Sequence, residues 1–169
     1  MSFQVTNNMS HVRCKLDLGN SRYLQVLDCK GEVSIDLIEW KDDKPTDKGI
    51  KFTLMRWVWW ILNLEVAEHA LRNNEPYELH LGGNVYCRVQ QDSIDVRQYW
   101  KSRDQMVPTQ KGLRLRHCEI KRLREVLPEV RLNVPELSGV EPCVFQRDHL
   151  TDLGTSQCPE CNPDDYMNW

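Results

Sequence analysis

The sequence lacks any long hydrophobic run. Its longest uninterrupted apolar stretch covers residues 57–62 and is bounded by Arg56 and Asn63. A membrane-spanning helix needs about 20 predominantly apolar residues, so we expect no transmembrane segment. The first residues contain neither a basic start nor an apolar core, and we therefore expect no secretory signal peptide.

Catalytic motifs are also lacking. The sequence contains no Gly-rich phosphate loop and no Ser/His/Asp arrangement, and its histidines are scattered. Asp36 and Asp95 occupy equivalent strand positions, but a paired structural role, in which they satisfy backbone donors or form a salt bridge across the two halves, explains them better than a catalytic pair. We therefore expect that the protein is not an enzyme.

Cysteine is present, but not in the pattern of a disulfide framework. Seven is an odd number and five of the seven stand singly, which favours free thiols in a reducing compartment. The exception is Cys158-Pro-Glu-Cys161, which with Cys143 and His149 offers four zinc ligands. A zinc ribbon usually has a second close pair, which is absent. We expect no cofactor, and a zinc ion in the tail is the weaker alternative.

Charge is unevenly distributed along the chain. The net charge is −3, but residues 129–169 contain eight acidic and two basic side chains. Residues 13–72 are balanced with ten of each sign, whereas residues 77–127 contain ten basic and six acidic side chains. A local excess of positive charge is typical of surfaces that bind polyanions. A well-solvated surface with no such partner is the alternative.

The most informative feature is an internal repeat, in which two stretches about sixty residues apart share their pattern. The offset is 63 residues between Gly19 and Gly82, 59 between Ser34 and Ser93, and 63 again between Lys48 and Lys111. Length changes confined to turns are expected of a duplicated module. The matching segments are 16–19 with 79–82, 23–26 with 86–89, 34–40 with 93–99, and 44–50 with 107–113.

Each copy is predicted to consist of four strands followed by one helix, which makes the fold α+β with two ββββα modules. The alternation of apolar and polar residues predicts strands at 12–18, 22–27, 32–40 and 49–53, and at 77–81, 84–89, 93–100 and 112–116. Polar loops containing Pro45 and Pro108 are expected before the fourth strand of each copy. The modules cover residues 12–73 and 77–128, and the linker between them is too short for independent domains.

The first helix is predicted over 54–72 with Thr53 as its N-cap, and the second over 117–127, ended by Pro128. The first helix is apolar on two faces, so it needs two partners, which we expect to be its own sheet and the second helix. The three tryptophans at 57, 59 and 60 are expected to pack in the core rather than to bind a ligand. Residues 129–169 are predicted to form an acidic, irregular tail.

Several of these segments resemble the positive cofactor four family of transcriptional coactivators. The fragment 23–40 resembles the family's core, and 94–100 and 106–113 are closer still to its Ile-Asp-Ile-Arg-Glu-Tyr strand and Pro-x-x-Lys-Gly-Ile loop. The resemblance implies a curved antiparallel sheet with a helix, paired as a homodimer that binds single-stranded or melted DNA with little sequence preference. It also implies a nuclear protein that works with the transcription machinery.

Two copies in one chain imply a covalent pseudo-dimer that is a monomer in solution. The family's contact positions fall on Arg97, Trp100 and Lys111 in the second copy and, as secondary contacts, on Arg22, Lys30, Lys44 and Lys48 in the first. The first copy departs from the family pattern, with Ile38 at an arginine position and Cys29 at an aromatic one. RNA is an alternative ligand, because phosphate contacts and stacking serve both nucleic acids.

Two alternatives to this function stay open at the level of the sequence. The departures in the first copy favour a protein-interaction module whose nucleic-acid binding has decayed. The acidic tail suggests a third interpretation, in which the tail folds back on the basic surface and blocks it.

Overall fold

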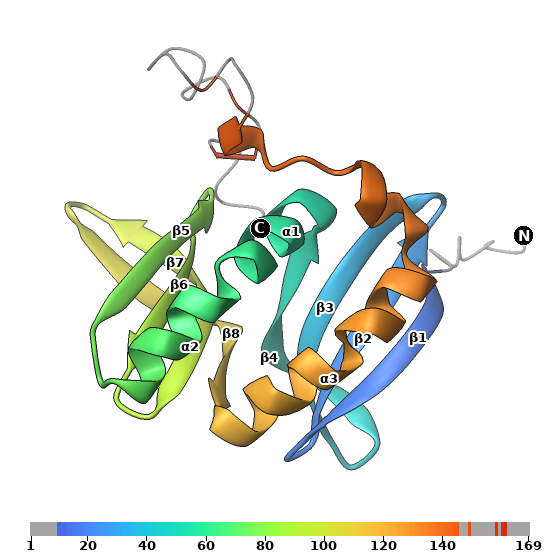
Figure 1. The fold of residues 1–169 in the computed structure, drawn as a ribbon, viewed down its shortest axis with the longest axis horizontal. Coiled ribbons are helices and arrows are strands. Elements are labelled where there is room, and N and C mark those ends of the chain that lie inside the picture. Colours follow the sequence, from blue (N-terminus) through green and yellow to red (C-terminus); the bar gives the residue numbers. More distant parts are fainter. Residues whose placement is uncertain (1–9, 146–148, 150–157, 159, 162–169) are drawn as a thin grey trace, which may run out of the picture.

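The computed structural model of the chain describes residues 10–145, 149, 158, 160 and 161 (Figure 1). The first four strands form one antiparallel sheet in the order β1-β2-β3-β4, and the next four form another in the order β5-β6-β7-β8. A helical segment follows each sheet, which confirms the predicted α+β fold with a ββββα repeat. Among the described residues, no helix is both long and apolar enough to cross a membrane.

The observed strands agree with the predicted ones in number and order. The first copy comprises β1 (Ser10–Gly19), β2 (Arg22–Cys29), β3 (Glu32–Lys41), β4 (Lys44–Thr53), α1 (Leu54–Leu62) and α2 (Leu64–Arg72). The second comprises β5 (Tyr77–Gly82), β6 (Val85–Gln90), β7 (Ser93–Ser102), β8 (Gln105–Arg116) and α3 (His117–Asn133), followed by the short 3₁₀ turns η1 (Pro135–Gly139) and η2 (Cys143–Phe145).

The two sheets pair their strands in the same register. Asp36 lies opposite Gln25 on one side and Lys51 on the other. The equivalent residue of the second copy, Asp95, lies opposite Arg88 and Arg114. Both sheets also have an irregularity in the pairing of their last two strands, after Ile38 and after Arg97. The repeat seen in the sequence is therefore a repeat of structure, residue by residue.

Pro45 and Pro108 lie inside β4 and β8, so the expectation of polar loops at these positions was wrong. Proline cannot donate to a ladder of hydrogen bonds, but β4 and β8 are edge strands, where proline is tolerated. The threonine after each proline holds the irregular pairing in place. Thr46 Oγ1 donates to Glu39 O (2.8 Å), and Thr109 Oγ1 donates to Gln98 O (2.7 Å).

Steric crowding explains why glycine follows lysine at Lys48-Gly49 and at Lys111-Gly112. A Cβ on Gly49 would lie 2.7 Å from Leu37 O, and one on Gly112 would lie 2.7 Å from both Val96 O and the Arg97 side chain. Real Cβ atoms do not approach other atoms so closely, so only glycine lets these two strands pair at this point.

The helices differ from the prediction at two points. Thr53 caps α1 as expected, with its hydroxyl accepting from Arg56 N, but the helix breaks at Asn63 into α1 and α2. Pro128 does not end α3, which continues to Asn133, so residues 129–133 belong to the helix rather than to the tail. Beyond Pro128 the helix buries Val130, and that burial favours continuing the helix despite the cost of an internal proline.

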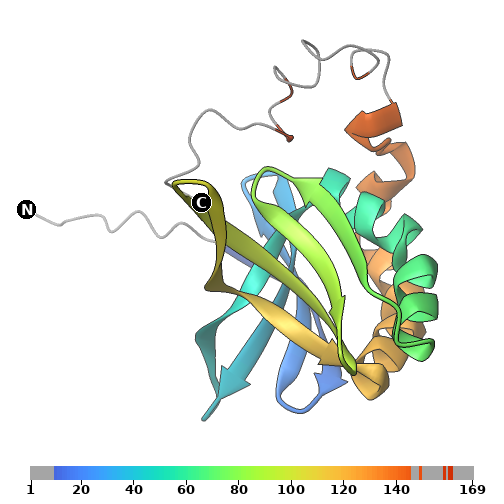
Figure 2. The same cartoon turned by 90° about the vertical axis from the view of Figure 1, so that its left-hand side faces the viewer.

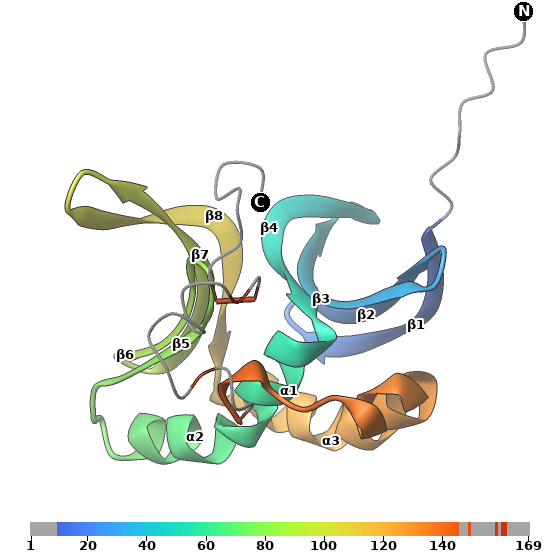
Figure 3. The same ribbon diagram turned by 90° about the horizontal axis from the view of Figure 1, so that it is seen from above.

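The helices pack crosswise between the copies. They lie on one side of the sheets (Figure 2), and β4 lies beside β8 where the two sheets meet (Figure 3). Helix α3 packs against β1 of the first sheet, whereas α2 packs against β6 and β7 of the second. Helix α1 packs on its own sheet, against β3 and β4, and also contacts β5, and the start of α3 contacts β8 of its own sheet. The second partner of the first helical segment is thus mainly the other copy's sheet, not the second helix as expected.

One continuous hydrophobic core joins both sheets and all three helices. Trp57 and Trp60 are buried in it beside Phe52, and Trp59 packs against its edge, which confirms that the tryptophans serve packing. The seven cysteines are free thiols, as expected.

Candidate nucleic-acid interface

A row of charged side chains crosses the second sheet on the face opposite the helices. Alternation along β6, β7 and β8 turns apolar residues toward the core and leaves polar ones on the other face. Asp95 stands at the centre of this face, between Arg88 and Arg114 on the neighbouring strands. Arg97 Nε donates to both oxygens of the Asp95 carboxylate (3.2 and 3.3 Å). Asp95 is therefore held in an ion pair, but this pair lies within β7 and not across the two copies as expected.

The same positions of the first sheet carry much less positive charge. Around Asp36 they hold Gln25, Ile38 and Lys51 in place of three arginines. Burial raises the pKa of the Asp36 carboxyl, and the nearby charge of Lys51 and the Ser34 hydroxyl lower it only in part. At matched positions, the second sheet has three cations around its aspartate and the first has one.

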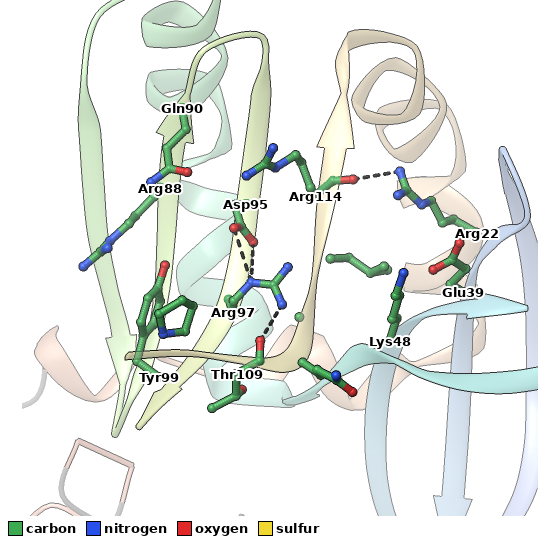
Figure 4. Close-up of a pocket in the computed structure, with 14 residues that line it drawn as sticks. Arg22, Glu39, Lys48, Arg88, Gln90, Asp95, Arg97, Tyr99, Thr109 and Arg114 are labelled. Carbon is green, nitrogen blue, oxygen red and sulfur yellow. Dashed lines mark hydrogen bonds and ion pairs between the residues drawn. The ribbon is translucent and has the colours of Figure 1, made fainter. Parts of the chain in front are cut away.

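The charged face of the second sheet borders a groove of about 590 Å³ (Figure 4). The first copy adds Arg22, Glu39 and Lys48 to it from β2, β3 and β4. Five cationic and two acidic side chains line the groove, so its walls carry a surplus of three positive charges. Its remaining lining residues are Gln90, Tyr99, Pro108, Thr109, Gln110, Gly112 and Leu113.

Two of the five cations already hold structural partners. Arg97 Nη1 donates to Thr109 O (2.5 Å) in addition to its bonds to Asp95. Arg22 Nη1 donates to Glu119 (2.5 Å) and to Arg114 O (2.7 Å), which ties β2 of the first copy to α3 and β8 of the second. Arg22 and Arg97 therefore stabilise the walls of the groove, and their guanidinium groups are less available to a ligand.

The other three cations are better placed to meet a ligand. Among the described residues, the side chains of Lys48 and Arg114 have no hydrogen bond or ion pair to a protein group. Arg88 forms an ion pair with Glu78 (2.8 Å), and because Glu78 is half-exposed this pair carries little energetic weight. Lys48, Arg88 and Arg114 together therefore form the part of the groove that is chemically available to an anion.

An aromatic pair with a cation on it recurs in both copies. Tyr86 and Tyr99 stand edge to face (5.6 Å between ring centroids), and the Arg88 guanidinium lies 4.5 Å from the Tyr99 centroid. The equivalent pair, Tyr23 with Trp40, carries Lys15 instead. Burial raises the pKa of the Tyr99 phenol, which keeps it neutral. Because Tyr99 is only 4% exposed, it supports Arg88 rather than offering a face for a base.

The structure separates the residues that the sequence pointed to as contacts. Arg22, Lys48 and Arg97 line the groove, and Lys111 lines a neighbouring hollow of about 850 Å³. Trp100 is 42% exposed on the β7–β8 hairpin, and alternation turns it to the face opposite Arg97 and Tyr99. Lys30 and Lys44 are exposed at the β2–β3 and β3–β4 turns. None of these last three is among the residues that line the groove.

Sequence reasoning missed Arg88 and Arg114. The repeat itself held the signal, because Arg88 is equivalent to Gln25 and Arg114 to Lys51 at the offset of 63 residues. Both flank Asp95 and alternate with buried residues such as Cys87 and Leu113. Aligning the copies by strand register would have placed them on the same face as Arg97.

A second group of functional side chains lies in the C-terminal segment, away from the groove. Cys143, His149, Cys158 and Cys161 form a cluster whose potential ligand atoms all lie within 4.8 Å of one another. None of the four lines the groove.

Comparisons of the chain with protein-family models, with curated proteins and with solved structures found no match.

Proposed function

We propose that this chain binds single-stranded nucleic acid through the groove on the second sheet, as a non-enzymatic protein of transcriptional-coactivator type. The observation that carries the proposal is the surplus of three positive charges on one groove, lined from both copies. Lysine and arginine side chains neutralise phosphates and release counterions, which supplies most of the affinity for a strand without regard to sequence. The indole of Trp100 is exposed on the adjoining hairpin but faces away from the groove, so it can stack on an unpaired base only where the strand leaves the groove.

We propose further that the two copies act as an intramolecular pseudo-dimer. The crosswise packing supports this, because α2 and α3 each cover the sheet of the other copy. A single core would leave neither copy stable alone. Covalent fusion also permits the two faces to diverge, which a symmetric homodimer cannot do. The neutral face around Asp36 and the basic face around Asp95 fit such a division of roles. Nuclear location and contact with the transcription machinery are part of this proposal through the family resemblance alone.

Binding of a labelled single strand of about 20 nucleotides tests the proposed function. Three to five phosphate contacts in the groove should give a slope of log K against log salt of about −2 to −3.5. A duplex of the same sequence should bind more weakly, because its bases are not available for stacking. An affinity no better than millimolar at low salt, or a flat salt dependence, would rule the function out.

A competing proposal is that the acidic tail folds back on the basic groove and blocks it. Two of its acidic residues are paired elsewhere: Glu136 with Arg13 (2.8 Å) and Glu160 with Arg56 (3.3 Å), and none of the described tail residues lines the groove. Glu129 belongs to α3 and Glu141 does not line the groove, and the other four tail acids, at 148, 152, 164 and 165, lie outside the described residues. Changing these four from Asp to Asn in the full chain should leave affinity unchanged, apart from a small general charge effect. A gain of tenfold or more would favour autoinhibition.

The chain should be a monomer in solution. Each helix already covers a sheet within the same chain, so the helices of the described part need no second copy to bury their core faces. Light scattering coupled to gel filtration should give the mass of one chain, 20.0 kDa. A stable particle of twice that mass would mean that the copies pair between chains.

We also propose a zinc ion as the cofactor of the chain, held by Cys143, His149, Cys158 and Cys161. Three thiols and one imidazole are a ligand set that zinc prefers. The sulfurs of Cys143 and Cys161 lie 3.6 Å apart, close to the about 3.8 Å between two corners of a tetrahedron with Zn–S bonds of about 2.3 Å. All corners would be filled by protein, which is typical of a structural site.

A further inference from the structure

The segment that carries the metal cluster is joined to the folded body by its backbone. Gly83 N, in the β5–β6 turn, donates to Cys161 O (2.8 Å). The neighbouring Gly82 has a φ of +119°, and a Cβ on it would lie 2.6 Å from Glu160 O. Only glycine at position 82 leaves room for the backbone of Glu160 to approach the β5–β6 turn this closely.

Glu160, which stands between the ligands Cys158 and Cys161, reaches the start of helix α1. Its carboxylate accepts from the Thr53 hydroxyl (3.1 Å) and lies 3.3 Å from Arg56 Nε, and its carbonyl accepts from Arg56 Nη2 (2.9 Å). Thr53 is also the N-cap of α1. One residue of the cluster segment thus holds both the cap and the first turn of a core helix.

Arg56 explains why this contact carries energetic weight. Its side chain is only 9% exposed, and a buried cation is costly unless an anion lies beside it. A zinc ion with three thiolates and a neutral imidazole has a net charge of −1. Such a centre would add to the negative charge of Glu160 next to Arg56.

We infer that the metal-bound cluster is a clasp that fastens the C-terminal segment to α1 and to the β5–β6 turn, so that zinc binding stabilises the whole body. This inference rests on the zinc ion proposed above. Without metal, no covalent bond would link the three thiols to one another among the described residues, and the segment would be held on the body only by the contacts of Glu160 and Cys161, so it would dock less firmly. Zinc binding and folding are then linked, because the folded body presents the docking site and the metal holds the segment on it.

The test compares the melting temperature of the full chain with and without its metal. The protein is purified with zinc present, its zinc content is measured by mass spectrometry, and unfolding is followed before and after EDTA. We expect one zinc per chain and a fall in melting temperature of roughly 5–20 °C on its removal, restored by added Zn²⁺. The C158S/C161S double variant should bind no zinc and show no response to EDTA. The matched control, C29S/C118S, removes two thiols outside the cluster and should behave like the unmodified chain.

A third variant separates the clasp from the metal site. E160Q keeps all four ligands, so it should keep its zinc while its melting temperature falls toward that of the EDTA-treated chain. One zinc per chain with no change of melting temperature on its removal would overturn the clasp and leave the metal site standing. A chain that retains no zinc, and no Co²⁺ with thiolate absorption bands, would overturn both. Neither result bears on the groove.

Discussion

Removing three positive charges from the groove, with Lys48→Gln, Arg88→Gln and Arg114→Gln in one chain, should weaken single-strand binding roughly 100-fold at about 0.1 M salt. The size follows from counterion release. Each phosphate contact on a single strand contributes about 0.7 to the slope of log K against log salt, hence about fivefold in affinity at 0.1 M. The slope itself should fall by about 2. Fluorescence anisotropy over a series of salt concentrations measures both quantities.

The choice of these three residues keeps the fold intact. The ion pairs Arg97–Asp95 and Arg22–Glu119, which have buried acidic partners, are left unchanged. The matched control carries K41Q, K101Q and K121Q, which remove the same charge from exposed positions that do not line the groove. If the control loses as much affinity as the groove variant, binding depends on net charge alone and the groove is not the site.

Glu119→Gln should lower the free energy of unfolding by about 3–5 kcal/mol, because it leaves the charge of Arg22 without its buried counter-ion. The Glu119 side chain is 1% exposed, and it also accepts from Arg116 N at the start of α3. The pair joins β2 of the first copy to a helix of the second, so its loss weakens the junction between the copies. Unfolding in urea, followed by tryptophan fluorescence, measures the change.

Glu125→Gln on the same helix is the control. Glu125 is 51% exposed and pairs with Arg122 one turn away (3.2 Å), so its loss should cost less than about 1 kcal/mol. Equal losses in the two variants would mean that the Arg22–Glu119 pair is no more than a surface contact.

The same pair bears on function, since Arg22 was expected from the sequence to contact nucleic acid and is instead bonded within the fold.

The strands and their register follow from local sequence. Alternation of apolar and polar residues has a period of two, and a slip by one residue would turn every core side chain to the solvent. The duplicated pattern therefore predicted eight strands in the order that the structure shows, without knowledge of the fold. The predicted boundaries near Pro45, Pro108 and Pro128 were wrong, because tolerance of these prolines depends on edge position and on the burial of distant residues.

The site was predictable only in part, and the reason is distance along the chain. The basic character of the second copy could be read from its charge, and the family resemblance pointed to Arg97 and Lys48, both of which line the groove. The partnership of Arg22 with Glu119 spans 97 residues, and no local pattern points from one to the other. Trp100 and Lys111 carry the right chemistry in the sequence, yet the pleat and the hairpin direct them away from the groove.

By itself, then, the sequence determined a duplicated ββββα module, its free thiols and the excess of cations on its second copy. These depend on neighbours within a few residues, where periodicity and composition act directly. Only the tertiary structure decided that the helices cross between the copies, that Lys48 joins Arg88 and Arg114 in one groove, and that Glu160 holds Arg56. Such contacts join residues far apart in the chain, and they arise because buried charges and apolar faces must find partners wherever the fold brings them.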